Sequence, residues 1–314
     1  MPFVPKKQAF NAHINEVVLG VGDKATAIGG QNVLPFHTFD AEIKNAPKIG
    51  VELTDLGMAE YTMPGEKAFY EGCTTVPEMA KRAESLEGAS FICLHLEGAD
   101  PNGLNKSVEE CVQLAKDVSD ATTLPLVIMG CKNIEKDTEL FNKIAEALAG
   151  KNILVLSARD ENYKTVGASA GLAYNQKVGA ESAVDINLAK QLNVLMTQLG
   201  VAPTSIVMNA GSAAAGYGYE YVASTLDRIR AAALAQSDTQ LQMPILTPVS
   251  PETWSVKESM VSEADMPEWG SAEERGIEME ITTAAACLAG GSDAVIMRHP
   301  AAIKAISEMI EALV

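Results

Sequence analysis

The chain is poor in several of the features from which protein function is usually read. Aromatic residues make up 5% of its 314 residues, and it contains only two tryptophans and four histidines. Acidic residues outnumber basic ones by 41 to 24, which gives a net charge of −17. An acidic chain repels phosphate backbones, so nucleic-acid binding is not expected. No apolar run approaches the roughly 18 residues that span a bilayer. We therefore expect no membrane contact and a cytoplasmic location.

The cysteines are too widely spaced to form a recognisable metal site. They are Cys73, Cys93, Cys111, Cys131 and Cys287, with no C-x-x-C and no C-x-x-H. A zinc or iron–sulfur site built from this chain alone is therefore not expected. The simplest interpretation is thiols packed as small hydrophobes in a reducing compartment. Cys131 directly follows an apolar run and is the cysteine expected nearest a functional site.

Short apolar runs that alternate with helical patterns make up most of the chain. There are eight of them: Lys48–Leu53, Ser90–Leu96, Pro125–Gly130, Asn152–Ala158, Val178–Ala183, Ser205–Ala210, Pro244–Val249 and Asp293–Met297. Such alternation indicates parallel strands, which need long crossover connections. Eight units predict a single α/β domain with a closed (β/α)8 TIM barrel rather than an open doubly wound sheet.

The expected barrel occupies residues 46–314 and follows an N-terminal extension of residues 1–45. Within this extension, Val17–Gly20 and Lys24–Ile28 read as two short strands of a hairpin. Such a hairpin could close the N-terminal end of the barrel. Chemistry in this fold lies at the opposite end, in the loops that follow the strands.

Several helix ends can be predicted from single residues. Ser107 and Glu110 form a capping box. Asp137 is expected to cap a helix that ends before Gly150, and Asp185 to cap a helix over Ile186–Leu199. Pro300 suits the first position of the last helix.

The glycine-rich stretch after the sixth run is the strongest local signal for a ligand. It reads Asn209-Ala-Gly-Ser-Ala-Ala-Ala-Gly-Tyr-Gly-Tyr-Glu-Tyr221. Tyr217 stands where a P-loop needs lysine, so this is not a phosphate loop. Small residues allow a large ligand to approach the backbone, and the tyrosines offer ring faces and hydroxyls. A loop that is small only for packing is the alternative. The candidate binding residues here are Asn209, Ser212, Gly216, Tyr217, Gly218 and Tyr219.

Other candidate residues follow the fifth and eighth runs. Asp185 and Asn187 suit amide or hydroxyl recognition, although Asp185 also has a capping role. Arg298 and His299 end the last run, and His299 could act as a general base or serve only a structural role. The long loop of residues 250–272 carries both tryptophans, which either contact a partner or pack the loop onto the barrel. No nucleophile with a matching acid is evident, so no catalytic residue is predicted.

Taken together, a set of short segments resembles one protein family. The segments are Val33–Phe39, Leu96–Pro101, Gly130-Cys131 with Glu135–Asp137, Glu161–Lys164, Val184–Asn187 with Lys190–Asn193, Gly216–Tyr221 with Arg228–Arg230, Glu273–Gly276 and Met297–Pro300. In this order they resemble the small subunit of the corrinoid iron–sulfur protein, also called the delta subunit of the acetyl-CoA decarbonylase/synthase complex.

The resemblance implies a non-catalytic barrel subunit of a methyl carrier in the reductive acetyl-CoA (Wood–Ljungdahl) pathway. It implies a large partner subunit that holds a [4Fe–4S] cluster and the corrinoid, a cobamide shared with the mouth of this barrel. A methyltetrahydrofolate methyltransferase and acetyl-CoA synthase are the further partners it implies. Two other functions stay open: a self-sufficient pterin-dependent methyltransferase, whose pterin Asp185, Asn187 and Asn209 could bind, and a pure scaffold.

Overall fold

The fold is a barrel of parallel strands surrounded by helices. This computed structural model describes Val4 and residues 6–314, so Met1–Phe3 and Pro5 of the expected extension lie outside the described residues. The barrel strands are β3 (Lys48–Thr54), β4 (Ala89–His95), β5 (Leu126–Met129), β6 (Leu154–Ala158), β7 (Lys177–Glu181), β8 (Ile206–Asn209), β9 (Leu246–Pro248) and β10 (Ala294–Met297). Each coincides with one of the eight predicted apolar runs, so the predicted (β/α)8 architecture is confirmed.

All neighbouring strands in this sheet are parallel, in the order β8-β7-β6-β5-β4-β3-β10-β9. The first and last strands of this order meet through one isolated parallel bridge between Met208 and Ile245. The sheet thus closes on itself, with its weakest pairing between β8 and β9.

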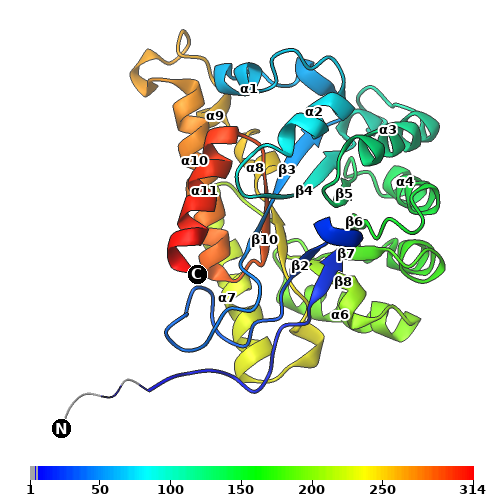
Figure 1. The fold of residues 1–314 in the computed structure, drawn as a ribbon, viewed down its shortest axis with the longest axis vertical. Helices are drawn as coiled ribbons and strands as arrows, with labels where there is room; N and C mark the ends of the chain where they lie inside the picture. The colour runs from blue at the N-terminus through cyan, green and yellow to red at the C-terminus, as the bar shows by residue number, and fades with distance from the viewer. Residues whose placement is uncertain (1–3, 5) are drawn as a thin grey trace.

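Helices form an outer layer around the strands (Figure 1). The long ones are α3 (Val108–Ala121), α4 (Ile134–Ala147), α6 (Ile186–Leu199), α7 (Tyr219–Ala235), α10 (Ala272–Gly290) and α11 (Pro300–Leu313). The short ones are α1 (Pro64–Phe69), α2 (Val76–Ala83), α5 (Tyr163–Val166), α8 (Ser250–Thr253) and α9 (Lys257–Met260), and α5 continues into a π-helical segment over Gly167–Ala173. In the part of the chain that the structure describes, no helix combines the length and apolar character needed to cross a bilayer.

The N-terminal hairpin closes one end of the barrel, as the sequence predicts. Its strands β1 (Val17–Leu19) and β2 (Thr26–Ile28) are antiparallel. Val17, Leu19 and Ile28 are almost fully buried and pack with the apolar side chains inside the barrel. Hydrogen bonds anchor the hairpin to the residues before the strands: Asn152 donates to the carbonyl of Val18 (2.8 Å).

The barrel interior is filled by alternate residues of each strand. Phe91 of β4 is fully buried inside, beside Gly50 of β3. A Cβ at Gly50 would lie 2.0 Å from the Phe91 ring, so only glycine leaves room for this large side chain. Aliphatic side chains and the one aromatic ring of Phe91 thus fill the lower barrel, as expected for a chain with few aromatic residues.

Most predicted helix caps are present. Ser107 accepts a hydrogen bond from the backbone N–H of Glu110, and Asp185 accepts from Asn187 and Leu188. Gly200, with a φ of 110°, ends α6. Pro300 is the first residue of α11.

The predicted cap at Asp137 is wrong. Asn133 caps α4 instead, because it has an extended backbone immediately before Ile134 and its side chain accepts from the N–H of Lys136 (3.0 Å). Asp137 lies inside the helix, and its carboxylate turns back to accept the N–H of Cys131 (2.7 Å). A Cβ at Gly130 would lie 2.3 Å from this carboxylate, so the glycine makes room for it. The helix therefore begins earlier than the capping pattern indicated.

Candidate ligand site at the barrel mouth

The open end of the barrel is polar where the closed end is apolar. Polar side chains stand at or just after the carboxyl ends of the strands, where parallel strands bring them together. They lie on or next to six strands, β3, β4, β6, β7, β8 and β10: Glu52, Thr54, His95, Ser157, Arg159, Glu181, Asn209 and Arg298. Two adjoining cavities lie among them, which we call the first cavity and the second cavity.

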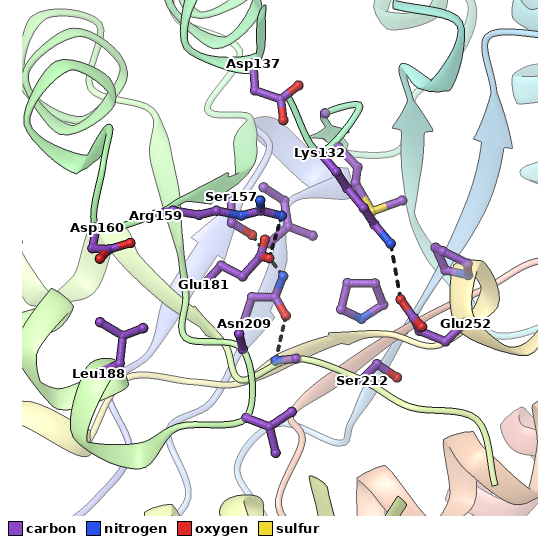
Figure 2. A pocket seen from close by; sticks show the side chains of 18 of the residues that line it. Lys132, Asp137, Ser157, Arg159, Asp160, Glu181, Leu188, Asn209, Ser212 and Glu252 are labelled. Carbon is purple, nitrogen blue, oxygen red and sulfur yellow. Dashed lines mark hydrogen bonds and ion pairs between the residues drawn. The ribbon is translucent and has the colours of Figure 1, made fainter. Parts of the chain in front are cut away.

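The first cavity has a volume of 570 Å³ and lies over β5 to β8. Figure 2 shows the side chains that line it. Arg159 pairs with Glu181 at 2.7 Å, and the Asn209 amide donates to the hydroxyl of Ser157 at 3.0 Å. Ser212 also lines this cavity, and its buried hydroxyl has no hydrogen-bond partner among the residues the structure describes. A cavity of this volume suits a ligand of the size of a typical cofactor fragment or drug.

The second cavity has a volume of 280 Å³ and lies over β3, β4 and the loop after β9. Its floor holds an ion pair in which His95 Nδ1 lies 2.8 Å from Glu52 Oε1. Burial opposes the charges of both groups, but the hydrogen bond and attraction between them outweigh it. The pKa of Glu52 is therefore lowered and the pKa of His95 is raised. Since Nδ1 faces Glu52, Nε2 is the nitrogen left for a ligand.

One ion pair separates the two cavities. Lys132, after β5, and Glu252, in α8, lie 3.3 Å apart and line both cavities. Figure 2 shows the two side chains reaching toward each other across the mouth. Both are substantially exposed, so the pair contributes about 0–1 kcal/mol and is screened by salt. Breaking this ion pair, which would join the two cavities, therefore costs little free energy.

Cys131 lies at the mouth, as its position after the third run predicts. It lines the second cavity, and its thiol donates to Asp137 at 3.3 Å. Burial, together with the nearby Asp137 charge, raises the pKa of Cys131 to about 12. The thiol is therefore protonated at neutral pH and is a poor nucleophile or metal ligand.

The candidate binding residues fall into three groups. Asn209 and Ser212 line the first cavity, and Arg298 lines the second. Gly216, Tyr217 and Gly218 form the loop before α7, and Tyr219 is the first residue of that helix. Tyr217 is 48% exposed and donates its hydroxyl to Glu258, which ties this loop to α9. Asp185, Asn187 and His299 lie outside the lining of both cavities.

Asp185 and His299 have structural roles in the described contacts. Asp185 caps α6, as already predicted, and Asn187 is exposed in the first turn. His299 is 2% exposed, and its Nδ1 accepts from the N–H of Ala301 at the start of α11. Its other nitrogen lies 3.1 Å from Glu273, and its ring stacks on Trp254 at 5.7 Å. These contacts favour the structural role of His299 over the role of general base.

A buried charge network supports the ends of β3 and β10. Arg298 donates to Glu66 at 2.7 Å and lies over the ring of Tyr61 at 4.6 Å. Glu280 of α10 accepts the backbone N–H groups of Arg298 (2.6 Å) and His299 (3.1 Å). Complete burial raises the pKa of Glu280 to about 8 despite these two donors. The network holds Arg298 rigidly at the wall of the second cavity.

The two tryptophans of the long loop have different surroundings. Trp254 is 6% exposed and packs against Gly276, where a Cβ would lie 2.3 Å from the indole. Trp269 is half-buried between Lys257 (5.1 Å) and Arg275 (5.6 Å). Trp254 therefore packs the loop onto the barrel, which is one of the two interpretations left open by the sequence.

Several mouth residues were not singled out from the sequence. Glu52 and Glu181 are polar residues inside predicted apolar runs, and Thr54 directly follows one; a polar residue near the end of such a run is the signal that could have found them. Arg159 directly follows β6 and Lys132 lies three residues after the end of β5, but isolated cations in loops are usually solvated, so they carried no signal. Among the described residues, no group of three or more His, Cys, Asp and Glu is arranged to hold a metal ion.

Comparison with known proteins gives the family. The sequence profile of the CO dehydrogenase/acetyl-CoA synthase delta subunit matches residues 16–309. The chain belongs to this delta-subunit family. It is 32% identical to the acetyl-CoA decarbonylase/synthase complex subunit delta of Archaeoglobus fulgidus, over 99% of this chain and 71% of that relative. It is 31% identical to the subunit of the same name from Methanothermobacter thermautotrophicus, over 98% of this chain and 78% of the relative.

Solved structures with a similar fold include dihydropteroate synthases. The enzyme from Xanthomonas albilineans has a TM-score of 0.55 and 14% sequence identity, with 85% of this delta-subunit family member and 93% of the enzyme covered. The enzyme from Yersinia pestis gives a TM-score of 0.54 at the same identity and coverage. At this identity the likeness concerns the fold alone, and it agrees with the TIM barrel described above.

Proposed function

We propose that this chain is the small subunit of a corrinoid iron–sulfur methyl carrier in the reductive acetyl-CoA pathway. Its barrel mouth covers a cobamide held by a large partner subunit. Membership of the delta-subunit family carries the proposal. The subunit itself performs no bond-breaking step, and methyltetrahydrofolate methyltransferase and acetyl-CoA synthase are the partners at the two ends of the methyl transfer.

The mouth fits part of a cobamide rather than the whole. A cobamide is much larger than the ligands that a cavity of 570 Å³ encloses. Its carboxamide side chains need both donors and acceptors, and the first cavity offers the Asn209 amide and the unpartnered Ser212 hydroxyl. A primary amide that reached Ser212 would give this buried hydroxyl the hydrogen bond it lacks. This supports contact with one edge of the macrocycle.

In the proposed complex, bound cobamide supplies the cobalt on which the methyl group travels. The residues of this chain hold and shield it. Gly216 and Gly218 have positive φ angles of 90° and 82°, which let the loop turn with little side-chain bulk at the rim. Tyr217, fixed to Glu258, offers an exposed ring beside them. The [4Fe–4S] cluster belongs to the partner, since Cys93 lies inside the barrel whereas Cys111 and Cys287 lie on α3 and α10.

Purification of the chain alone and together with the large subunit tests this proposal. We expect a stoichiometric corrinoid only in the pair, together with methyl-accepting activity. If the chain alone retained one corrinoid per molecule and accepted methyl groups, the proposal would be wrong. In the pair, Tyr217→Ala and Ser212→Ala should slow methyl transfer, with Val18→Ala at the closed end as the control. Unchanged rates in both mouth variants would favour a pure scaffold.

A pterin-dependent methyltransferase is the second candidate. The observation that favours it is the volume of the first cavity, which suits a pterin and places the Asn209 amide in its wall. Calorimetry with methyltetrahydrofolate separates the two functions. Heat of binding that disappears in Asn209→Ala would favour the methyltransferase, whereas no heat at high protein concentration would remove it.

A further inference from the structure

The second cavity carries more negative charge than its own cations balance. Its lining contains Glu52, Glu60, Glu97, Asp100 and Glu252 against His95, Lys132 and Arg298. Two of the acidic groups are paired within the cavity, Glu52 with His95 and Glu252 with Lys132. Arg298 is engaged by Glu66, which lies outside the lining. Each basic side chain of the cavity is thus already paired with a carboxylate.

The remaining carboxylates lack a close cation. Glu60 lies 4.0 Å from Arg298, at the limit of an ion pair. Neither Glu97 nor Asp100 has a basic side chain within this distance in the described part of the chain, and the hydrogen bonds to the Asp100 carboxylate there come from the neighbouring Asn102. Burial and the Glu97 charge raise the pKa of Glu60. A positive charge placed nearby would stabilise the ionised form of Glu60 and lower this pKa again.

A second observation, independent of the carboxylates, points to a ligand. Thr54 is 2% exposed and lines this cavity, and its hydroxyl has no hydrogen-bond partner among the residues the structure describes. Buried hydroxyls are normally hydrogen-bonded, since an unpaired one costs about 1–3 kcal/mol. Thr54 pairs in register with His95 and lies two residues after Glu52 on the same strand, so these three side chains face the same side of the sheet, and all three line the second cavity.

We propose that the second cavity is a binding site for a protonated primary amine. An ammonium group has three donors and no acceptor. It can donate to the Thr54 hydroxyl at the floor and to Glu97 and Asp100 at the rim, and its charge balances the excess of carboxylates. The Trp254 side chain supplies an apolar wall for the carbon atoms attached to the ammonium.

Other ligand classes fit less well. An anion would meet Glu97, Asp100 and Glu60 at the entrance, and the cations that could attract it are already paired. A neutral amide could hydrogen-bond to Thr54 but would leave the excess negative charge unbalanced. The proposal does not rest on the corrinoid function, because it concerns the other cavity and is tested on the chain alone.

Trp254 provides a local reporter for the test. The chain has two tryptophans, so Trp269→Phe leaves Trp254, which lines the cavity, as the single tryptophan, and excitation at the red edge of the indole band reports on it. The probes are n-butylammonium, butyramide and butyrate at matched ionic strength. We expect a saturable change in Trp254 fluorescence with n-butylammonium, with a Kd on the order of 1–10 mM for so small a ligand. Butyramide and butyrate should bind at least tenfold more weakly.

Three variants link this binding to the named residues. Glu97→Gln combined with Asp100→Asn should weaken n-butylammonium binding tenfold or more, and Thr54→Val should weaken it several-fold. Glu109→Gln combined with Glu139→Gln removes two exposed carboxylates from α3 and α4; it is the control for net charge and should have no effect. Circular dichroism and the unfolding midpoint identify any variant that does not fold. Because Thr54→Val removes an unsatisfied group, it is expected to fold normally.

The results have a clear meaning in each case. The proposal is overturned if butyrate or butyramide binds as tightly as n-butylammonium, or if n-butylammonium gives no saturable change in fluorescence. It is also overturned if the Kd for n-butylammonium is unchanged both in the Glu97→Gln/Asp100→Asn variant and in Thr54→Val. Repeating the n-butylammonium titration on the assembled complex identifies the source of the amine. Retained binding points to a free amine, whereas blocked binding points to a lysine side chain of the partner; either result supports ammonium recognition.

Discussion

The two ends of this barrel are built from the same strands but have opposite chemistry. At the closed end, Val17, Leu19 and Ile28 of the hairpin are almost fully buried against the apolar interior. At the open end, the interior positions become charged and amide side chains around two cavities. The hairpin end therefore contributes apolar packing inside the barrel, whereas the open end contributes the groups that can contact a ligand. Substitutions at the two ends should therefore differ in how strongly they change stability.

The largest effect is expected from the buried ion pair at the closed end. Arg230 and Asp293 are each 2% exposed and contact one another, and Asp293 also accepts the N–H of Ile245 at 2.7 Å. Asp293→Asn leaves the Arg230 charge buried without its counter-charge and should cost about 3–5 kcal/mol of unfolding free energy. Urea unfolding measures this. A loss below about 1 kcal/mol would show that the closed end tolerates an unpaired charge.

The hairpin provides the next comparison. Leu19 is fully buried and Val18, its neighbour, is 38% exposed on the same strand. Leu19→Ala should cost about 2–5 kcal/mol because it opens a cavity in the core. Val18→Ala should change stability by no more than about 0.5 kcal/mol. Similar losses in both variants would mean that the hairpin does not plug the barrel in solution.

At the open end, Glu280 should make stability depend on pH. Its folded pKa of about 8 lies above the ordinary value of 4.5. Between these values the folded state keeps a proton that the unfolded chain has lost, so its contribution to stability falls as pH rises, by about 1.4 kcal/mol per unit. The unfolding free energy of the natural chain minus that of Glu280→Gln should therefore fall from pH 5 to pH 8. A constant difference would place the folded pKa near 4.5.

The smallest effect on stability concerns Thr54 itself. Thr54→Val removes a buried hydroxyl without a partner and should leave stability unchanged or raise it by up to about 1 kcal/mol. The matched control is Thr253, also buried, whose hydroxyl donates to the carbonyl of Val249 at 3.1 Å. Thr253→Val should cost about 0.5–1.5 kcal/mol. Equal losses in the two variants would mean that Thr54 has a hydrogen-bond partner in solution.

The fold could be predicted from the sequence because its signals are local and repeated. Each apolar run and each cap, such as Ser107 or Asp185, is recognisable within a few residues, and eight repeats reinforce one another. The error at Asp137 shows the limit. Its carboxylate turns toward Gly130 and Cys131, and this contact depends on how the loop folds back onto the helix.

The site was harder to predict because its parts come from distant strands. Asn209 and Ser212 were found through the glycine-rich loop, which is a contiguous signal. The Glu52–His95 pair joins residues from two different strands, and each alone looks like an isolated polar residue in an apolar run. Only the parallel register of β3 and β4 brings them together.

The single bridge that closes the barrel has a consequence for how the mouth can change shape. Elsewhere around the cylinder several residue pairs join each strand to the next, but in the described residues β8 is joined to the residues at the start of β9 by the single bridge between Met208 and Ile245. Local opening follows the line that breaks the fewest hydrogen bonds, so amide exchange should be fastest along this seam. The glycine-rich loop leaves from β8 and the tryptophan-bearing loop from β9. The barrel wall should thus deform most easily directly beneath these two loops, which are the ones proposed to contact the largest ligands and partners.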